Sequence, residues 1–326
     1  MDIINSNNDS FSQNLYNSKI QEMRRIISTV IFGQDKTVDL LLTAILANGH
    51  VLIEGVPGVA KTLSARLLAK LIDAEFSRIQ FTSDIMPSDV IGTNVFNMGT
   101  NQFEFHKGPA FGDIILVDEI NRAPAKTQSA LFELMEERQT TVDGVCYSMG
   151  DIYTVVATQN PIEQEGTYRL PEAQMDRFMF KVSVGYPSAL AEVQVLNAHN
   201  GTQDYNKLSN ITSVLSKSEL LDLRKMAHDV YVDPKILEYI VAIVQQTRSH
   251  KALYVGGSPR ASIALMAASK AFALIQGRSF VIPDDVKLLA VSVLQHRVSL
   301  TAEAEMEGIT VAHIVDEIIN KIEVPK

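Results

Sequence analysis

A glycine-bearing turn between an apolar run and a helix-forming segment constrains this chain more than any other feature. Residues 55–62 read GVPGVAKT and follow the apolar run from His50 to Ile53. Between a buried strand and a helix, such a turn points backbone N–H groups inward at an anion, and the helix N-terminus adds the positive end of its dipole. The sequence therefore predicts a phosphate cradle, in which Lys61 would reach the β- and γ-phosphates and the Thr62 hydroxyl would bind Mg²⁺.

The turn departs at one position from the pattern G-x-x-x-x-G-K-[ST]. Ala60 replaces the second glycine, and Gly58 stands two residues earlier. The last turn position must therefore accept a methyl group. A glycine turn can also join any strand to any helix without binding a ligand, and this alternative stays open. Against it, Lys61 in the first turn of a helix is electrostatically unfavourable unless an anion lies there.

A second segment ends in two adjacent carboxylates. Residues 111–119 read FGDIILVDE, and the run from Ile114 to Val117 predicts a strand buried on both faces. Two acids at the end of a buried strand are costly unless a cation or another positive group compensates them. We predict that Asp118 holds Mg²⁺ through its water shell and that Glu119 polarises the attacking water. A solvated strand end is the alternative.

The composition excludes several classes of protein. Hydrophobic residues make up 46% of the 326 residues, enough for the cores of two domains, and the net charge of −9 disfavours non-specific binding to nucleic acid or anionic membranes. A single cysteine, Cys146, allows no internal disulfide and fits a reducing compartment, so we expect a cytoplasmic protein. No apolar run approaches the roughly 20 residues that span a bilayer. Residues 1–18 are polar and lack the pattern of a signal peptide.

Strands and helices alternate over the first part of the chain. We expect strands at residues 51–54, 77–81, 114–117, 153–157 and 178–184, and helices at 38–47, 61–72 and 127–137. This order predicts an α/β fold with a five-stranded parallel sheet covered on both faces. Ligands of such sheets bind beyond the carboxyl ends of the strands, where Gly55, Asp118 and Asn160 would lie.

Two hairpins interrupt this alternation. Residues 93–106 alternate around a turn at 97–99, and residues 139–156 carry the two-residue turn signal Asp143-Gly144. They are either decorative insertions or projections that touch a partner.

The second part of the chain is helical. After the break at Tyr186-Pro187 we expect helices at 219–228, 234–247, 259–276 and 283–294, and a polar loop at 197–210. The chain thus divides into a flexible N-terminal arm (residues 1–18), an α/β nucleotide-binding domain (19–186) and a smaller all-α domain (187–326).

Three further polar residues have a catalytic character. Asn160 follows a predicted strand, where its carboxamide would hold the attacking water or contact the γ-phosphate, although Asn-Pro is also a common turn. Arg177 either forms a local ion pair with Asp176 or acts as an arginine finger on the nucleotide of an adjacent subunit. Arg260 falls in the first turn of a helix, where the dipole opposes a cation. It either turns to solvent or reaches the phosphates and reports the nucleotide state.

These elements, in this order, resemble the AAA+ ATPases and, among them, the MoxR family. The resemblance runs from about Phe32 to the C-terminus and is carried by GVPGVAKT, FTSDIMPSDVIGT, KGPAFGDIILVDEINRAPAKTQSALFELMEERQTTVDG, ATQNPIEQEGTYRLPEAQMDRF and GGSPRA. It implies an AAA+ P-loop core followed by a smaller all-α lid domain. It also implies that the hairpins are the helix-2 insert and the pre-sensor-1 hairpin, which face a central pore.

The resemblance assigns a role to each candidate residue. Lys61 and Thr62 match Walker A, Asp118 and Glu119 Walker B, Asn160 sensor 1, Arg177 the arginine finger and Arg260 sensor 2. The expected nucleotide-binding residues are Gly55, Val56, Pro57, Gly58, Val59, Ala60, Lys61, Thr62 and Leu63, with Phe32 and Gly33 at the adenine; Thr62 and Asp118 would hold the metal, and Glu119, Asn160, Arg177 and Arg260 would be catalytic. ATP and Mg²⁺ are the implied cofactors.

One departure from the family concerns a second arginine. Arg169 stands where many relatives show proline, eight residues before Arg177, which leaves open which of the two points across a subunit boundary. We favour Arg177, because the sequence Asp-Arg-Phe at the start of a strand fixes its direction.

The implied function is Mg²⁺-dependent ATP hydrolysis that drives chaperone-like remodelling of, or cofactor insertion into, a partner protein. Family members usually form hexameric rings and often work with von Willebrand factor A domain proteins. The alternatives are a chelatase-type motor subunit, a nucleotide-gated scaffold with little hydrolysis, and a DNA-directed motor, which the acidic composition disfavours.

Overall fold

A five-stranded parallel sheet forms the centre of the protein. The computed structural model describes residues 2–56, 58–161, 167–200 and 208–325. The strands are β1 (Val51–Gly55), β2 (Phe76–Gln80), β5 (Ile114–Asp118), β8 (Thr154–Gln159) and β9 (Phe180–Val184), in the order β2-β5-β8-β1-β9. Every pairing in this sheet is parallel. The predicted α/β sheet is confirmed, with strand ends shifted by one or two residues.

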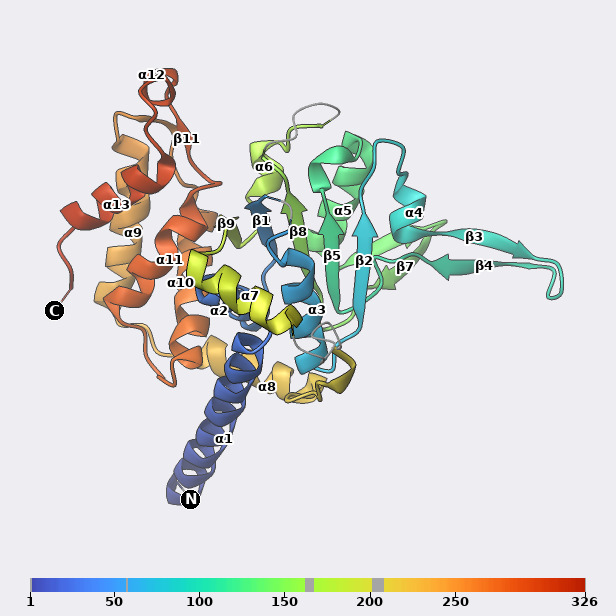
Figure 1. Ribbon diagram of the computed structural model, residues 1–326, viewed down its shortest axis with the longest axis horizontal. Coiled ribbons are helices and arrows are strands. Elements are labelled where there is room, and N and C mark those ends of the chain that lie inside the picture. The colour runs from blue at the N-terminus through green and yellow to red at the C-terminus, as the bar shows by residue number, and fades with distance from the viewer. Residues whose placement is uncertain (1, 57, 162–166, 201–207, 326) are drawn as a thin grey trace.

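Alternate residues of the strands pack into two hydrophobic clusters, one on each face of the sheet. On β5, Ile114 and Leu116 belong to one cluster, and Ile115 and Val117 to the other. Helices α2 (Asp35–Leu46) and α3 (Lys61–Leu71) contribute to the first cluster, and α5 (Ala125–Glu137) contributes to the second (Figure 1). Because both faces are covered, the strands read as continuous apolar runs.

Two antiparallel hairpins extend from this domain. Directly after α4 (Pro87–Ile91), β3 (Gly92–Asn97) pairs with β4 (Gln102–Lys107), and this hairpin projects far beyond the body of the molecule (Figure 1). Strands β6 (Gln139–Val142) and β7 (Val145–Ser148) are joined by Asp143 and Gly144, both with positive φ, as a tight hairpin turn requires. The second hairpin ends before the expected residue 156, because residues from Thr154 onward pair into the central sheet.

Helices form most of the C-terminal part. The predicted helices are α8 (Lys217–Asp229), α9 (Pro234–Ser249), α10 (Pro259–Ile275) and α11 (Pro283–Leu294); α12 (Ala302–Met306) and α13 (Val311–Lys321) were not expected. Proline occupies the first turn of α9, α10 and α11, where its missing N–H costs nothing. A short ladder joins β10 (Leu253–Val255) to β11 (Ser299–Leu300). Leu265 and Val286 of these helices extend the cluster that also contains α2 and α3.

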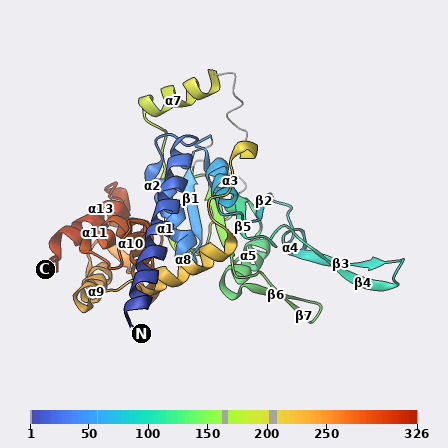
Figure 2. The same ribbon diagram turned by 90° about the horizontal axis from the view of Figure 1, so that it is seen from below.

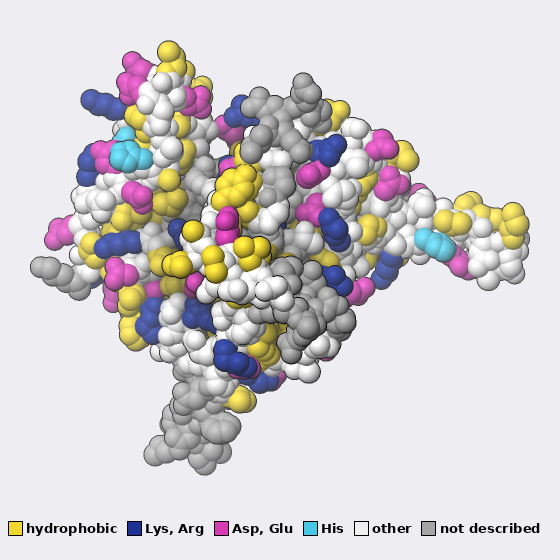
Figure 3. All heavy atoms as spheres, viewed as in Figure 1, with side chains coloured by type: hydrophobic (Ala, Val, Ile, Leu, Met, Phe, Trp, Pro, Cys, Tyr) yellow, Lys and Arg dark blue, Asp and Glu magenta, His cyan; other side chains and the backbone are white. Residues whose placement is uncertain are grey.

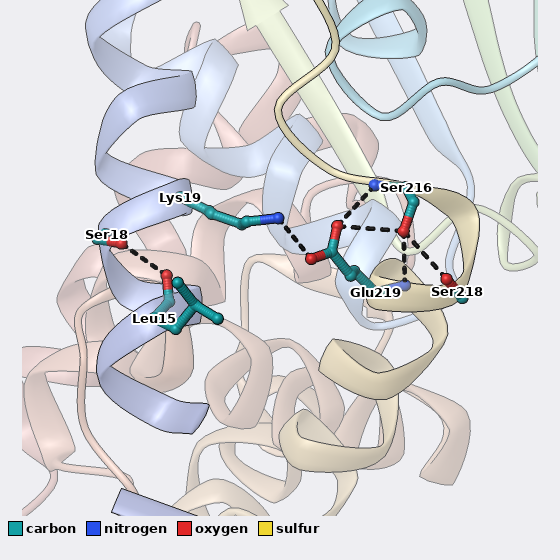
Figure 4. A network of polar contacts seen from close by, with 6 residues as sticks. All are labelled: Leu15, Ser18, Lys19, Ser216, Ser218 and Glu219. Carbon is teal, nitrogen blue, oxygen red and sulfur yellow. Dashed lines mark hydrogen bonds and ion pairs between the residues drawn. The ribbon is translucent and has the colours of Figure 1, made fainter. Parts of the chain in front are cut away.

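The N-terminal stretch forms helix α1 (Asp2–Ser28). The arm expected at residues 1–18 falls on the first part of this helix from Asp2 onward. Ile20, Met23 and Ile27 are buried at helical spacing, so the second half of α1 packs on the first cluster. Lys19 pairs with Glu219 at the start of α8, as Figure 4 shows. Within the described ranges, none of the helices has the length and apolar character needed to cross a membrane.

Helix α7 (Ala189–Asn200) corrects the loop expected at residues 197–210. Residues 197–200 form its last turn, residues 201–207 lie outside the described residues, and the short helix η2 (Leu208–Asn210) follows. The polar residues that follow position 196 hid the helix, although Ala189–Leu196 contains good helix formers. Figure 2 shows α7 standing apart from the main body. The domain boundary near residue 186 stays a prediction.

A buried histidine joins the sheet to α5. His50 Nε2–H donates to the carbonyl of Met135 at 3.0 Å, and Nδ1 accepts a hydrogen bond from the Val155 N–H at 2.9 Å. Since a backbone N–H occupies Nδ1, the ring is neutral, and protonation would break this bond. Burial lowers the pKa of His50 to about 4.

We predict that the free energy of unfolding decreases as the pH falls from about 6.5 toward 4. The unfolded chain has a histidine pKa near 6.5, so it binds the proton first, and the folded state loses about 2 kcal/mol by pH 5 through His50 alone. Thermal melts between pH 7.5 and 4.5 measure this loss. The variant His50→Gln, which keeps a donor and an acceptor, should show a shallower pH dependence, and the exposed control His228→Gln should not. An equally steep curve in His50→Gln would contradict the assignment.

Candidate functional site

The predicted phosphate-binding and carboxylate residues meet at one edge of the sheet. Gly55 ends β1, Asp118 ends β5, and Asn160 follows β8, which lies between those two strands. Because all strands are parallel, their carboxyl ends share this edge, where ligands of α/β sheets bind. Lys61, the first residue of α3, begins there as well.

The turn between β1 and α3 has the backbone of an anion cradle. Gly58 and Ala60 both have positive φ, +85° and +56°, which turns successive N–H groups toward the start of α3. A side chain at Gly55 would meet the carbonyl oxygen of Val184 at 2.5 Å, so glycine is required there. Pro57 lies outside the described residues.

Ala60 takes the left-handed conformation that glycine usually provides in this pattern. An alanine in this region costs roughly 1 kcal/mol relative to glycine. The last position of the turn therefore accepts the methyl group of Ala60, as the sequence requires, at the cost of a strained backbone conformation.

The side chain of Lys61 folds back onto the turn. Its Nζ donates to the carbonyl oxygen of Gly55 at 2.7 Å. Burial lowers its pKa, while the negative charges of Asp118 and Glu119 act in the opposite direction. The ammonium group is therefore within electrostatic reach of both carboxylates and is held by the Gly55 carbonyl, whose place an anion in the cradle could take.

Asp118 is only 8% exposed, and its charge is compensated from a neighbouring strand. Arg78 Nε of β2 donates to Oδ2 at 2.7 Å, and the Thr158 hydroxyl of β8 donates to Oδ1 at 3.2 Å. We did not expect Arg78 from the sequence. The alternation of side chains along β2 could have indicated it, since Arg78 and Gln80 share a face of this strand and β2 pairs with β5.

Glu119 leaves the strand in a left-handed conformation, with φ +56°. Its Oε2 accepts hydrogen bonds from Arg122 at 2.9 Å, in the short helix η1 (Ile120–Arg122), and from Gln80 at 3.0 Å. Its backbone N–H donates to the Thr158 hydroxyl at 3.0 Å. Gln80 and Arg122 thus fix the direction of the Glu119 carboxylate. Glu119 follows Asp118 in the chain, but the two carboxylates are held by different side chains.

A divalent cation fits the donors at this edge. Among the described residues, no three His, Cys, Asp or Glu side chains are grouped to hold a metal by themselves. Asp118 and the Thr62 hydroxyl at the start of α3 would supply only oxygen ligands, which would suit Mg²⁺ completed by water and phosphate oxygens.

The residue that follows the predicted adenine segment contacts the cradle. Gln34 Nε2, adjacent to Phe32 and Gly33, donates to the carbonyl of Val59 at 2.8 Å. Gly33 has φ +69°, and a side chain there would meet Cβ of Ala191 at 2.7 Å. The first turn of α7 therefore lies close to the segment that precedes α2, and α7 had no place in the predicted site.

Arg177 and Arg260 lie together, but away from the cradle. Arg177 comes three residues before β9, at the amino edge of the sheet, and a five-residue strand spans roughly 16 Å. Its NH2 pairs with Oε2 of Glu136 at 2.8 Å, and Arg260 NH2 pairs with Oε1 of the same carboxylate at 3.3 Å. Glu136 is the penultimate residue of α5, which runs antiparallel to the strands (Figure 1).

The local ion pair considered for Arg177 is not formed. Asp176 instead pairs with Arg297 at 2.6 Å. Arg169, the alternative cross-subunit arginine, is exposed and lines a cavity of about 440 Å³ between α6 (Glu172–Met175) and the lid, with Asp176 and Arg297. Ser258 lines the same cavity, so Arg169 lies near the segments that carry Arg177 and Arg260.

Comparisons with known proteins agree with this geometry. Residues 50–180 match the family described as ATPase family associated with various cellular activities (AAA), and residues 245–318 match the AAA lid domain. The chain is 49% identical to the uncharacterized protein YeaC of Bacillus subtilis, with 92% of each chain covered. It is 41% identical to the chaperone MoxR1 of Mycobacterium tuberculosis, over 92% of this chain and 81% of that one. A crystal structure from Cytophaga hutchinsonii, named "putative ATPase", superposes with a TM-score of 0.92 at 39% identity, covering 99% of this chain and all of that one.

We predict that Arg78→Met lowers the stability of the free protein by about 1–2 kcal/mol, since it leaves the buried Asp118 carboxylate without its cation. Mg²⁺ with ATP should raise the melting temperature of Arg78→Met more than that of the wild type, because the metal then compensates Asp118. Differential scanning calorimetry with and without Mg-ATP measures both effects. Arg66→Met, an exposed arginine of α3, is the control. Equal losses in the two variants would refute the pairing.

Proposed function

The chain belongs to the MoxR family of AAA+ ATPases, and from this membership we propose that it hydrolyses ATP to ADP and phosphate, with Mg²⁺, to remodel a partner protein. The observation that supports this best is the meeting of Lys61, Asp118 and Glu119 at the start of α3. A cation, a buried carboxylate and a second, aimed carboxylate are what phosphoryl transfer to water requires.

The cradle residues would bind the triphosphate. The N–H groups of the turn and Lys61 would neutralise the β- and γ-phosphates once the Lys61 ammonium leaves the Gly55 carbonyl. Thr62 and Asp118 would hold Mg²⁺, whose charge stabilises the leaving group. Phe32 and Gly33, which lie beside Gln34 and the turn, would contact the adenine.

Glu119 would take the proton of the attacking water. Arg122 and Gln80 hold its Oε2, which fixes the direction of the carboxylate. Asn160, at the end of the neighbouring strand β8, would orient the same water.

We infer that Arg177 and Arg260 act on the nucleotide of an adjacent copy. Both lie at the amino edge of the sheet, whereas the cradle of the same chain lies at the carboxyl edge. A head-to-tail ring would bring these two edges together, since a heterologous interface that closes generates a ring. Assembly into a hexamer and completion of the site by the next subunit are therefore part of the proposal.

The long hairpin would contact the partner. Met98 at its tip is 91% exposed and Phe103 is 71% exposed, and Figure 3 shows hydrophobic side chains gathered on this projection. Phe96 and Phe103 stack edge-to-face at 5.3 Å, so the apolar surface is preformed. A von Willebrand factor A domain protein is the proposed partner, either as a remodelled client or in cofactor insertion, and we propose a cytoplasmic location.

We predict that Glu119→Gln binds ATP and stalls turnover. Removing a general base costs roughly 10² to 10⁴ in rate, while the cradle and Asp118 stay intact. Phosphate release should fall by this factor, and Mg-ATP should still raise the melting temperature as in the wild type. The control is Glu133→Gln, an exposed acid of α5. Wild-type turnover in Glu119→Gln would disprove the assignment, and negligible turnover in the unmodified protein would favour the nucleotide-gated scaffold.

We predict that two inactive variants restore activity when mixed. Lys61→Ala removes the cradle cation and Arg177→Ala removes the arginine, yet a mixed ring contains interfaces with both groups intact. At equal amounts, about a quarter of the interfaces would be complete if copies assemble at random. Phosphate release from mixed and separate variants tests this. Activity that stays at the level of the separate variants would mean that Arg177 does not act across subunits.

A further inference from the structure

One carboxylate joins two arginines from the two domains. Each oxygen of Glu136 pairs with a different guanidinium, Oε2 with Arg177 of the α/β part and Oε1 with Arg260 at the start of α10. Arg177 also lies over the ring of Phe132, with Cζ 5.9 Å from the ring centre. Glu136 was not a candidate residue in the sequence.

Both Glu136 and Arg260 stand at the wrong helix end for their charge. Glu136 is in the last turn of α5, which contains no basic residue, and Arg260 is in the first turn of α10, which contains no acidic residue. The helix dipole disfavours the anion Glu136 in a last turn and the cation Arg260 in a first turn. Each is therefore stabilised by the other rather than by its own helix, and residues that break a local rule often serve function.

We propose that Glu136 is a positioning residue that holds Arg177 and Arg260 side by side, so that both guanidiniums face the phosphates bound by the next copy. This inference rests on the proposed ATP hydrolysis and on assembly of the protein. Without a carboxylate between them, two guanidiniums would repel each other and separate. With it, each arginine uses one N–H on Glu136 and keeps others for an anion, because a guanidinium carries five donors.

The geometry favours positioning over simple blocking. Glu136 is partly exposed, and Arg260 is more exposed still, so the pairing leaves Arg260 accessible from solvent. Arg177 is less exposed, and its Nε finds no acceptor among the residues that the structure describes. A phosphate oxygen from an adjacent copy would meet a pair of cations already oriented, which is how preorganised charges stabilise a transition state.

The test compares Glu136→Gln with Glu137→Gln, the exposed neighbour on α5, in the full-length protein. Glutamine keeps one acceptor oxygen but places an NH₂ group against the other arginine. We expect kcat at saturating ATP and saturating protein concentration to fall about tenfold in Glu136→Gln, with KM changed less than twofold. Glu137→Gln should match the wild type, and the melting temperatures of both variants should stay close to it.

A double-mutant cycle separates positioning from a merely structural role. In an Arg260→Ala background, Glu136→Gln should lower kcat by a smaller factor than in the wild type, because one of its two arginines is gone. A wild-type or raised kcat in Glu136→Gln, or equal factors in both backgrounds, would overturn the proposal. If Glu136→Gln does not fold, Glu136→Asp, which keeps the charge but cannot reach both arginines, must lower kcat instead. Absence of turnover in the wild type would refute the proposed function and this role of Glu136 with it, whereas normal turnover in the wild type with an unchanged kcat in Glu136→Gln would refute this role alone.

Discussion

The common direction of the five strands is the constraint on which the rest of the structure depends. A parallel sheet requires each strand to return through a helix on its face, so the helices run opposite to the strands. The start of α3 then lies at the carboxyl edge and the end of α5 at the amino edge. The first helix end attracts anions and the second attracts cations. One domain thereby presents positive helix-dipole ends at one edge of the sheet and negative ends at the other, separated by the length of a strand.

The charged side chains at the carboxyl edge have partners within the edge itself. Asp118 pairs with Arg78, Glu119 with Arg122, and the Lys61 ammonium rests on the carbonyl of Gly55. Such compensation is necessary because an unpaired charge near a buried strand end is expensive. It also means that the proposed binding of a metal-bound triphosphate would exchange the partners of Lys61 and Asp118 and would not fill an unpaired site.

Sequence patterns predicted the elements whose signal is local and left out those that depend on contacts between distant segments. The buried strands, the Pro-initiated helices and the turn at Asp143-Gly144 each carry their own signature, and the structure confirms them. Helix α1 was missed because its amino half is polar, and α7 because its weakly amphipathic pattern gives no periodic stripe. Arg78 and Glu136 were missed for another reason. Their partners lie 40 residues or more away in the sequence, and only the sheet register and the packing of α10 bring them together.

The two kinds of contact between the lid and the sheet domain have different consequences for motion. Apolar side chains of α10 and α2 belong to one continuous cluster, so a lid that swung away would expose much of that surface to water at a cost of roughly 25 cal/mol per Å². Movement of the lid is therefore restricted to sliding of packed helices, which keeps apolar contact. The pairing of Arg260 with Glu136 is partly exposed and costs little to rearrange. If the nucleotide state of a neighbouring copy alters the lid, the polar contact at Glu136 can respond at lower cost than the apolar contact, because it exposes none of the cluster that α1, α2 and α10 share.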